Sequence, residues 1–93
     1  MTYFVYVLGN YKKFKLTTYV GYTNSLKKRL KLHNEGKGAK FTRGRKWKII
    51  YKEKYKTKSE AIKREYYIKK NRRLRNFIKN NINEKIREQF NNI

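Results

Sequence analysis

Few side chains in this sequence could catalyse a reaction, and the first candidates are an arginine and the only histidine. Arg29 and His33 lie four residues apart, so a helix would place both on one face. Arginine is suited to bidentate phosphate binding, and histidine is the side chain whose ordinary pKa lies near neutrality. The pair favours phosphate chemistry, whereas a lone histidine more often has a structural role.

Glu65 is the carboxylate with the strongest reason to bind a ligand. All six acidic residues are glutamates, and none forms a close pair before the C-terminal segment, which argues against a site of two metal ions. On a helix, Glu65 shares a face with Ala61 and Ile68, where a lone charge needs a partner or a ligand. One Mg²⁺ held by this carboxylate, water and phosphate is feasible, and a salt bridge to a lysine is the alternative.

The charge points to a polyanionic partner. The 93 residues include 27 Lys and Arg, and the formal net charge is +21. Such a surplus repels itself in the compact state, and nucleic-acid backbones would neutralise it in a salt-dependent way. Codon bias in an AT-rich genome is the competing explanation. Without cysteine the chain has no disulfides and no cysteine-based zinc site. It has neither an apolar run of about 20 residues nor a signal-peptide pattern, so we expect a soluble, cytoplasmic protein without a membrane partner.

Two strands are predicted at residues 3–8 and 17–22, where β-branched and aromatic side chains dominate. Gly9-Asn10 signals a turn, so the two strands would form a hairpin. Tyr6 and Tyr19 could then point to the same face, which is the usual arrangement of core tyrosines with a hydroxyl at the edge. A glycine inside the second strand also suggests that another group approaches the backbone closely there.

The remaining elements complete a small α+β domain. A helix capped by Thr23 or Asn24 would run to about Asn34. Residues 47–55 alternate in character and predict a third strand with one basic face. The pattern Thr57-Lys58-Ser59-Glu60 is a capping box that opens a helix to about residue 71. The acids Glu35 and Glu53 are expected to lie in solvent.

A final helix over residues 72–91 carries apolar residues four apart, from Leu74 and Ile78 through Ile82 and Ile86 to Phe90. Its stripe predicts a packing face, and a homodimer could use it. The predicted order is strand-strand-helix-strand-helix-helix, with a three-stranded antiparallel sheet flanked by helices. We expect one domain over residues 1–93, with a core at about 3–75.

A glycine-rich basic loop over residues 35–46 separates the first helix from the third strand. It lacks the spacing of a nucleotide-binding phosphate loop. Its cations alternate with Phe41 and Trp47, which suits a groove for single strands or splayed junctions; a solvated surface loop is the alternative. The candidate substrate-binding residues are Lys37, Lys40, Arg43 and Arg45.

The spacing of these residues resembles the GIY-YIG nuclease superfamily, in particular its small stand-alone branch. Phe4-Val5-Tyr6 stands where that family has its GIY tripeptide, and Tyr19-Val20-Gly21 stands where it has YIG. Arg29 matches the family's helix arginine, and His33 follows one turn later. Ala61-Ile62-Lys63-Arg64-Glu65 matches the helix that presents the metal-binding glutamate. Phe4 replaces the family's first glycine, and the late active-site asparagine of many members has no convincing match among Asn71, Asn76 and Asn80.

The resemblance implies an endonuclease that hydrolyses DNA phosphodiester bonds with one divalent cation, Mg²⁺ or Mn²⁺. Tyr6, assisted by Tyr19 or His33, would accept a proton from the attacking water, and Arg29 would stabilise charge on the phosphate. Glu65 would hold the metal. Because the pKa of tyrosine is about 10, we expect the cationic surroundings to lower it. Single-stranded, branched or damaged DNA is the expected substrate; an inactive or weakly active accessory protein for DNA repair or RNA is the alternative.

Overall fold

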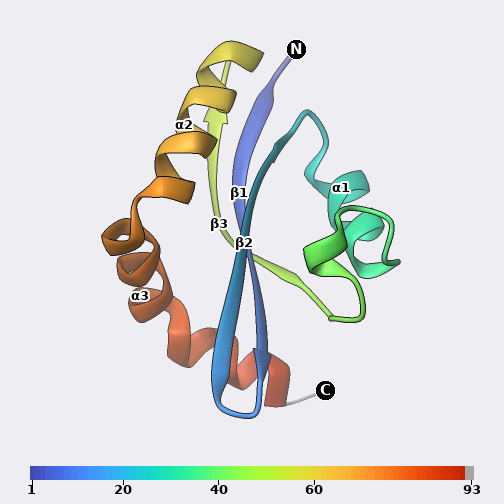
Figure 1. Ribbon diagram of the computed structural model, residues 1–93, viewed down its shortest axis with the longest axis vertical. Coiled ribbons are helices and arrows are strands. Elements are labelled where there is room, and N and C mark those ends of the chain that lie inside the picture. Colours follow the sequence, from blue (N-terminus) through green and yellow to red (C-terminus); the bar gives the residue numbers. More distant parts are fainter. Residues whose placement is uncertain (92–93) are drawn as a thin grey trace.

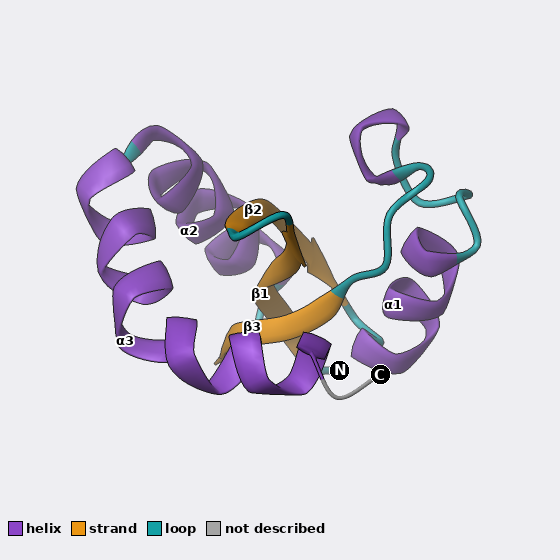
Figure 2. Ribbon diagram, turned by 90° about the horizontal axis from the view of Figure 1, so that it is seen from below, coloured by secondary structure: helices purple, strands orange, loops and turns teal. Residues whose placement is uncertain are grey.

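The protein is an α+β fold in which a three-stranded antiparallel sheet lies between two helical layers. The computed structural model describes the backbone of residues 1–91 and the side chains of residues 1–81. Figures 1 and 2 show helix α1 and the short 3-10 helix η1 on one side of the sheet and helices α2 and α3 on the other. The elements are β1 (Tyr3–Lys12), β2 (Lys15–Thr23), α1 (Leu26–Asn34), η1 (Lys40–Thr42), β3 (Lys48–Tyr55), α2 (Lys58–Lys70) and α3 (Arg72–Asn91).

The order of elements and the fold class predicted from the sequence are confirmed. The strands are arranged β2-β1-β3, so the first strand is central and both of its partners run antiparallel to it. No helix among the described residues is long and apolar enough to cross a membrane.

The β1–β2 turn lies further along the chain than predicted. β1 continues through Gly9 and Asn10, which are buried, and the register reaches the pair Lys12–Lys15. The missing side chain of Gly9 leaves room for Ile50, because a Cβ there would lie 2.8 Å from that side chain. The turn itself is formed by Lys13 and Phe14, whose φ angles are +52° and +64°. This left-handed conformation costs L residues roughly 1–2 kcal/mol each.

A β-bulge changes the face to which residues of the third strand point. The pairing shifts between Val7, which faces Tyr51, and Leu8, which faces Ile49, so one residue is left over. Ile49 packs with Tyr6, Leu8 and Trp47 beneath α1, whereas Tyr51 packs with the cluster beneath α2 and α3. The simple alternation predicted for residues 47–55 is therefore wrong, because an inserted residue interrupts the two-residue period.

Each α-helix begins at a capping side chain, and the cap of α1 differs from the predicted one. Ser25 caps α1, and Thr23 instead bonds to the backbone of Ser25. The predicted start of α2 at Thr57 is confirmed, because the Thr57 hydroxyl accepts from the Glu60 amide at 3.2 Å and donates to the Glu60 carboxylate at 2.9 Å. Asn71, one of the unassigned asparagines, accepts from the Leu74 amide at 2.9 Å and so starts α3.

The first half of the predicted C-terminal stripe packs inside the molecule. Ile78 is buried and Leu74 is half-buried against the same cluster, which contains Val5, Val7 and Ile68. The expected second half, at Ile82, Ile86 and Phe90, lies outside the described side chains. The dimer through this helix stays a prediction.

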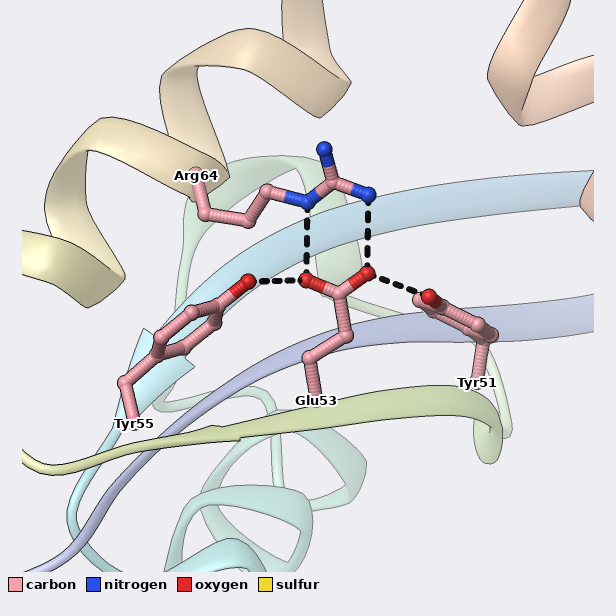
Figure 3. A network of polar contacts seen from close by, with 4 residues as sticks. All are labelled: Tyr51, Glu53, Tyr55 and Arg64. Atoms are coloured by element: carbon pink, nitrogen blue, oxygen red, sulfur yellow. Dashed lines mark hydrogen bonds and ion pairs between the residues drawn. The ribbon is translucent and has the colours of Figure 1, made fainter.

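Glu53 is the most heavily bonded carboxylate of the described residues, and the expectation that it lies in solvent is wrong. Figure 3 shows Arg64 of α2 forking onto it, with Nε 2.8 Å from Oε1 and Nη2 2.9 Å from Oε2. The hydroxyls of Tyr55, at 2.6 Å, and Tyr51 donate to the same two oxygens. The bulge turns Glu53 toward α2, so this network joins β3 to the helix that carries Glu65.

These bonds make stability depend on pH. The bonds from Arg64 and the tyrosines outweigh the effect of burial and lower the pKa of Glu53 from 4.5 to about 2. A carboxyl with a depressed folded-state pKa stabilises the fold above its unfolded value and loses that contribution as pH falls. The Glu53 contribution should therefore be complete above about pH 4.5 and decline toward pH 2.

We expect Glu53→Gln to lower the free energy of unfolding by about 1–3 kcal/mol at pH 6, with a smaller loss near pH 2.5. Urea unfolding at the two pH values measures both differences. Glu35→Gln is the matched control, since Glu35 is exposed. A Glu53→Gln loss that does not shrink in acid would contradict the assignment.

Candidate active site

Tyr6 lies in the middle of the central strand, and its ring crosses over the neighbouring strand at a glycine. Tyr6 is paired with Gly21 of β2, and a Cβ on that glycine would collide with the phenol of Tyr6. The close approach suggested by a glycine within the strand is therefore present. Gly21 allows the phenol to extend beyond β1 and to meet α1.

The phenol of Tyr6 ends on His33, which is completely buried. Tyr6 Oη lies 2.8 Å from His33 Nε2, and His33 Nδ1 lies 2.9 Å from Thr42 Oγ1. The Thr42 hydroxyl donates its only proton to the carbonyl of Ala39 at 2.9 Å. It must therefore accept from Nδ1–H, which leaves Nε2 of a neutral imidazole to accept from the Tyr6 hydroxyl. The arrangement is a directed chain of three hydrogen bonds.

Burial governs the protonation of this pair. It raises the pKa of Tyr6 to about 12 and exceeds the opposing effect of Arg29 nearby. The expectation that positive surroundings lower the pKa of this tyrosine is therefore wrong. Burial also lowers the pKa of His33 from 6.5, and the positive charge of Arg29 acts in the same direction. At neutral pH both partners are uncharged.

Arg29 comes from α1, as predicted, and lies close enough to Tyr6 to affect its ionisation. Its Nη2 makes a long contact of 3.5 Å to the carbonyl of Gly38. Its Nε is buried, and within the part of the chain that the structure describes it has no hydrogen-bond partner. A buried guanidinium donor without an acceptor is costly, which suits a site that receives an anion.

Glu65 approaches from α2 on the other side of the sheet, at the β2 edge. Its side chain is 15% exposed and its carboxylate pairs with Lys69 at 2.8 Å, and its charge acts to raise the pKa of Tyr6. The salt bridge that the sequence left as an alternative is therefore formed. Lys69 is 45% exposed, so the ion pair is open to solvent.

Tyr19 connects the two helical layers at this edge. Its ring centroid lies 5.1 Å from that of His33, and it stacks on Phe41 at 6.2 Å. Lys69 Nζ lies 5.9 Å from the ring of Tyr19 on the side of α2. The structure thus brings all five predicted site residues to one edge of the sheet, and their catalytic roles stay predictions.

The loop before β3 is folded around a tryptophan. Trp47 is only 2% exposed and donates from Nε1 to the carbonyl of Thr42 at 2.9 Å, so its expected place in a substrate groove is wrong. Phe41 is half-exposed and lies beneath the guanidinium of Arg45, 4.9 Å from the ring centroid. The predicted substrate-binding side chains are all exposed: Lys37, Lys40, Arg43 and Arg45.

Thr42 is the site residue that the sequence did not reveal. It is completely buried, and it orients His33 through one hydrogen bond. Gly38 has a related role, because a Cβ at that position would lie 2.8 Å from His33 Cε1. A threonine in a loop has no distinguishing signal, and only the packing of η1 against α1 brings it to the histidine.

A family model for the GIY-YIG catalytic domain matches residues 2–83. The match covers both tyrosine strands, α1 and α2, which are the elements that form the site. The chain therefore belongs to the GIY-YIG family.

Within that family, it is similar to small proteins named UPF0213. It is 44% identical to one from Staphylococcus aureus over 69 residues, which cover 73% of this chain and 80% of that protein. It is 58% identical to one from Bacillus licheniformis over 53 residues, which cover 56% of this chain but only 55% of that protein. The solution NMR structure of the UPF0213 protein BH0048 from Bacillus halodurans shares 36% identity, with 82% of this chain and 79% of that chain covered and a TM-score of 0.46.

The hydrogen-bond directions at His33 can be measured, because it is the only histidine. We expect ¹⁵N NMR of the imidazole at pH 7 to show the neutral tautomer with the proton on Nδ1, and a pKa below 6.5. Thr42→Val removes the acceptor and should shift the ring toward the Nε2–H tautomer. Thr17→Val, on a different part of the sheet, is the matched control. A predominantly Nε2–H ring in the unmutated protein would contradict the proton directions described above.

Proposed function

We propose that this protein is an endonuclease that uses a divalent cation to hydrolyse phosphodiester bonds in DNA. The observation that carries the proposal is the neutral Tyr6–His33 pair beside the unpartnered donor of Arg29. A proton acceptor, an anion-binding group and a carboxylate are the parts that metal-assisted phosphoryl hydrolysis requires. Membership of a family described as a catalytic domain supports the same class of reaction.

The Tyr6–His33 bond offers a path for the proton of the attacking water. A tyrosine with a pKa of about 12 is seldom ionised at neutral pH, so free phenolate is a poor candidate for the base. Instead, as the water oxygen bonds to phosphorus, its proton moves to Tyr6 Oη while the phenol proton moves to His33 Nε2. The bond from phosphorus to the 3′ oxygen breaks, and that oxygen takes a proton from solvent. His33 is left as imidazolium and returns its proton to water.

The charged groups around this path would bind and stabilise the phosphate. Arg29 can donate its free Nε–H to a phosphate oxygen as negative charge grows in the transition state. Glu65 would be the protein carboxylate for a single divalent cation, and water and phosphate would have to supply most other ligands, because the described residues contain no group of three metal-ligating side chains. Mg²⁺ or Mn²⁺ held there, with water and phosphate as further ligands, would neutralise charge on the leaving oxygen.

The substrate we propose is single-stranded, branched or damaged DNA. The exposed cations of the basic loop lie on the α1 side of the site, and Phe41 offers half of its ring surface for stacking. Aromatic surfaces beside cations bind bases that have left the duplex stack.

Two observations favour the alternative, a weakly active or inactive accessory protein that binds nucleic acid. Tyr6 is only 2% exposed, so a water molecule has little access to its hydroxyl before substrate binds. The carboxylate of Glu65 is also paired with Lys69. Catalysis requires substrate or metal to displace that lysine, whereas nucleic-acid binding does not.

Cleavage distinguishes the two functions. With Mg²⁺ or Mn²⁺, we expect the protein to cut labelled single-stranded or branched DNA, and Tyr6→Phe and Glu65→Gln to slow single-turnover cleavage by about 10²–10⁴-fold. Tyr22→Phe and Glu35→Gln are matched controls outside the site and should cleave normally. Metal-dependent cleavage that survives both site variants would refute the assignment. Absence of cleavage on every DNA and RNA substrate would favour the accessory function.

The pH dependence tests the proton path separately. Because His33 must be neutral to accept a proton and its pKa is lowered from 6.5, the cleavage rate should be constant near neutrality. It should fall about tenfold per pH unit once pH drops below the pKa of His33. His33→Gln should cleave slowly and lack this acidic limb. A wild-type rate that instead rises steadily between pH 7 and 9 would indicate that phenolate is the base.

A further inference from the structure

The tip of the β1–β2 hairpin presents an aromatic side chain to solvent in an unfavourable backbone conformation. Phe14 is 86% exposed, and it forms the two-residue turn with Lys13, both at positive φ. Turns of this type favour Asn-Gly, because those residues adopt positive φ most easily. Neither residue is present at this tip, so the turn carries two large side chains in a strained backbone conformation.

The charges around Phe14 indicate what it would contact. Lys12, Lys13 and Lys15 are all exposed, so three cations flank one aromatic ring within four consecutive positions. No acidic residue lies between Met1 and Asn34, and hence none in this hairpin offsets them. An exposed ring between cations matches the surface that binds unpaired nucleotides, where bases stack and phosphates pair with lysines.

The tip is a separate surface from the candidate active site. Lys12 follows Tyr6 by six positions in β1, which is a distance of roughly 20 Å along an extended strand. Figure 1 shows the tip at the end of the sheet opposite the N-terminus, away from α1 and η1. The step between stacked nucleotides is about 3.4 Å, so this distance corresponds to about six nucleotides.

We propose that the hairpin tip is a second nucleic-acid contact, in which Phe14 stacks on an unpaired base and the adjacent lysines bind its flanking phosphates. This second contact rests on the proposed nuclease function, because it would select the substrates that the active site cleaves. A substrate whose strand is unpaired about six nucleotides from the cleaved bond would engage both surfaces at once. The tip would then favour branched or partly single-stranded DNA over a continuous duplex.

Two glycine substitutions at the tip separate stacking from turn stability. Phe14→Gly and Lys13→Gly each place glycine at a positive φ, so each should raise the melting temperature by about 4–8 °C. Only Phe14→Gly removes the ring. We expect it to weaken binding of a fluorescein-labelled 20-nucleotide oligothymidine about tenfold, measured by anisotropy in EDTA so that no cleavage occurs. Lys13→Gly should lose less affinity, mainly as a smaller dependence on salt. Phe14→Trp should bind as the wild type does.

Three results would overturn the proposal. One is wild-type oligothymidine affinity in Phe14→Gly when its melting temperature confirms folding. The second is an equal loss in Lys13→Gly, which would assign the effect to charge or turn geometry. The third is a Phe14→Gly variant that loses binding to vesicles containing phosphatidylglycerol but keeps its oligothymidine binding, which would assign the tip to a membrane surface. Failure of the nuclease proposal is distinguishable, because it would appear as absent cleavage with metal while the binding difference in EDTA remained.

Discussion

The hydrogen-bond chain from Tyr6 through His33 to Thr42 is the interaction on which the candidate site depends. It joins the central strand, α1 and the η1 loop through three side chains that are almost fully buried. These hydrogen bonds can form only because Gly21 has no side chain where the phenol crosses β2. Buried polar groups are costly unless each is satisfied, so these contacts constrain one another. The position of α1 over the sheet, and with it the position of Arg29, follows from that constraint.

On the opposite face of the sheet, a hydrogen-bonded network around Glu53 holds α2, the helix that carries Glu65. Glu53 receives four donors from Arg64, Tyr51 and Tyr55 (Figure 3). Arg64 precedes Glu65 in α2, so the ion pair also restrains the rotation of the helix that presents this carboxylate. The candidate site residues thus come from both helical layers. The α1 layer is held to the sheet by a buried hydrogen-bonded group, and the α2 layer by a partly buried one. The site residues meet at the β2 edge, where Tyr19 contacts both layers.

The sequence predicted the parts of the structure that depend on local pattern. Strand and helix order, the start of α2 at Thr57 and the family motifs all follow from short-range chemistry or spacing, and the structure agrees. The errors arose where a non-local contact decides the outcome. The bulge near Ile49 reverses the faces of later residues, so Glu53 turns inward. Thr42 and Trp47 become buried only when the loop folds onto α1, and loop residues have no periodicity that could have indicated this.

The large net charge acts on this protein through its surface rather than through the protonation of its buried site. Arg29 lowers the pKa of Tyr6, but burial raises it more. Exposed lysines are surrounded by water and salt, which screens their fields over about 10 Å. Their charge would therefore attract polyanions and release counterions on binding, which is the role that we propose for the basic loop and the hairpin tip. Proton transfer in the site would instead depend on a neutral histidine that the surface charge scarcely reaches.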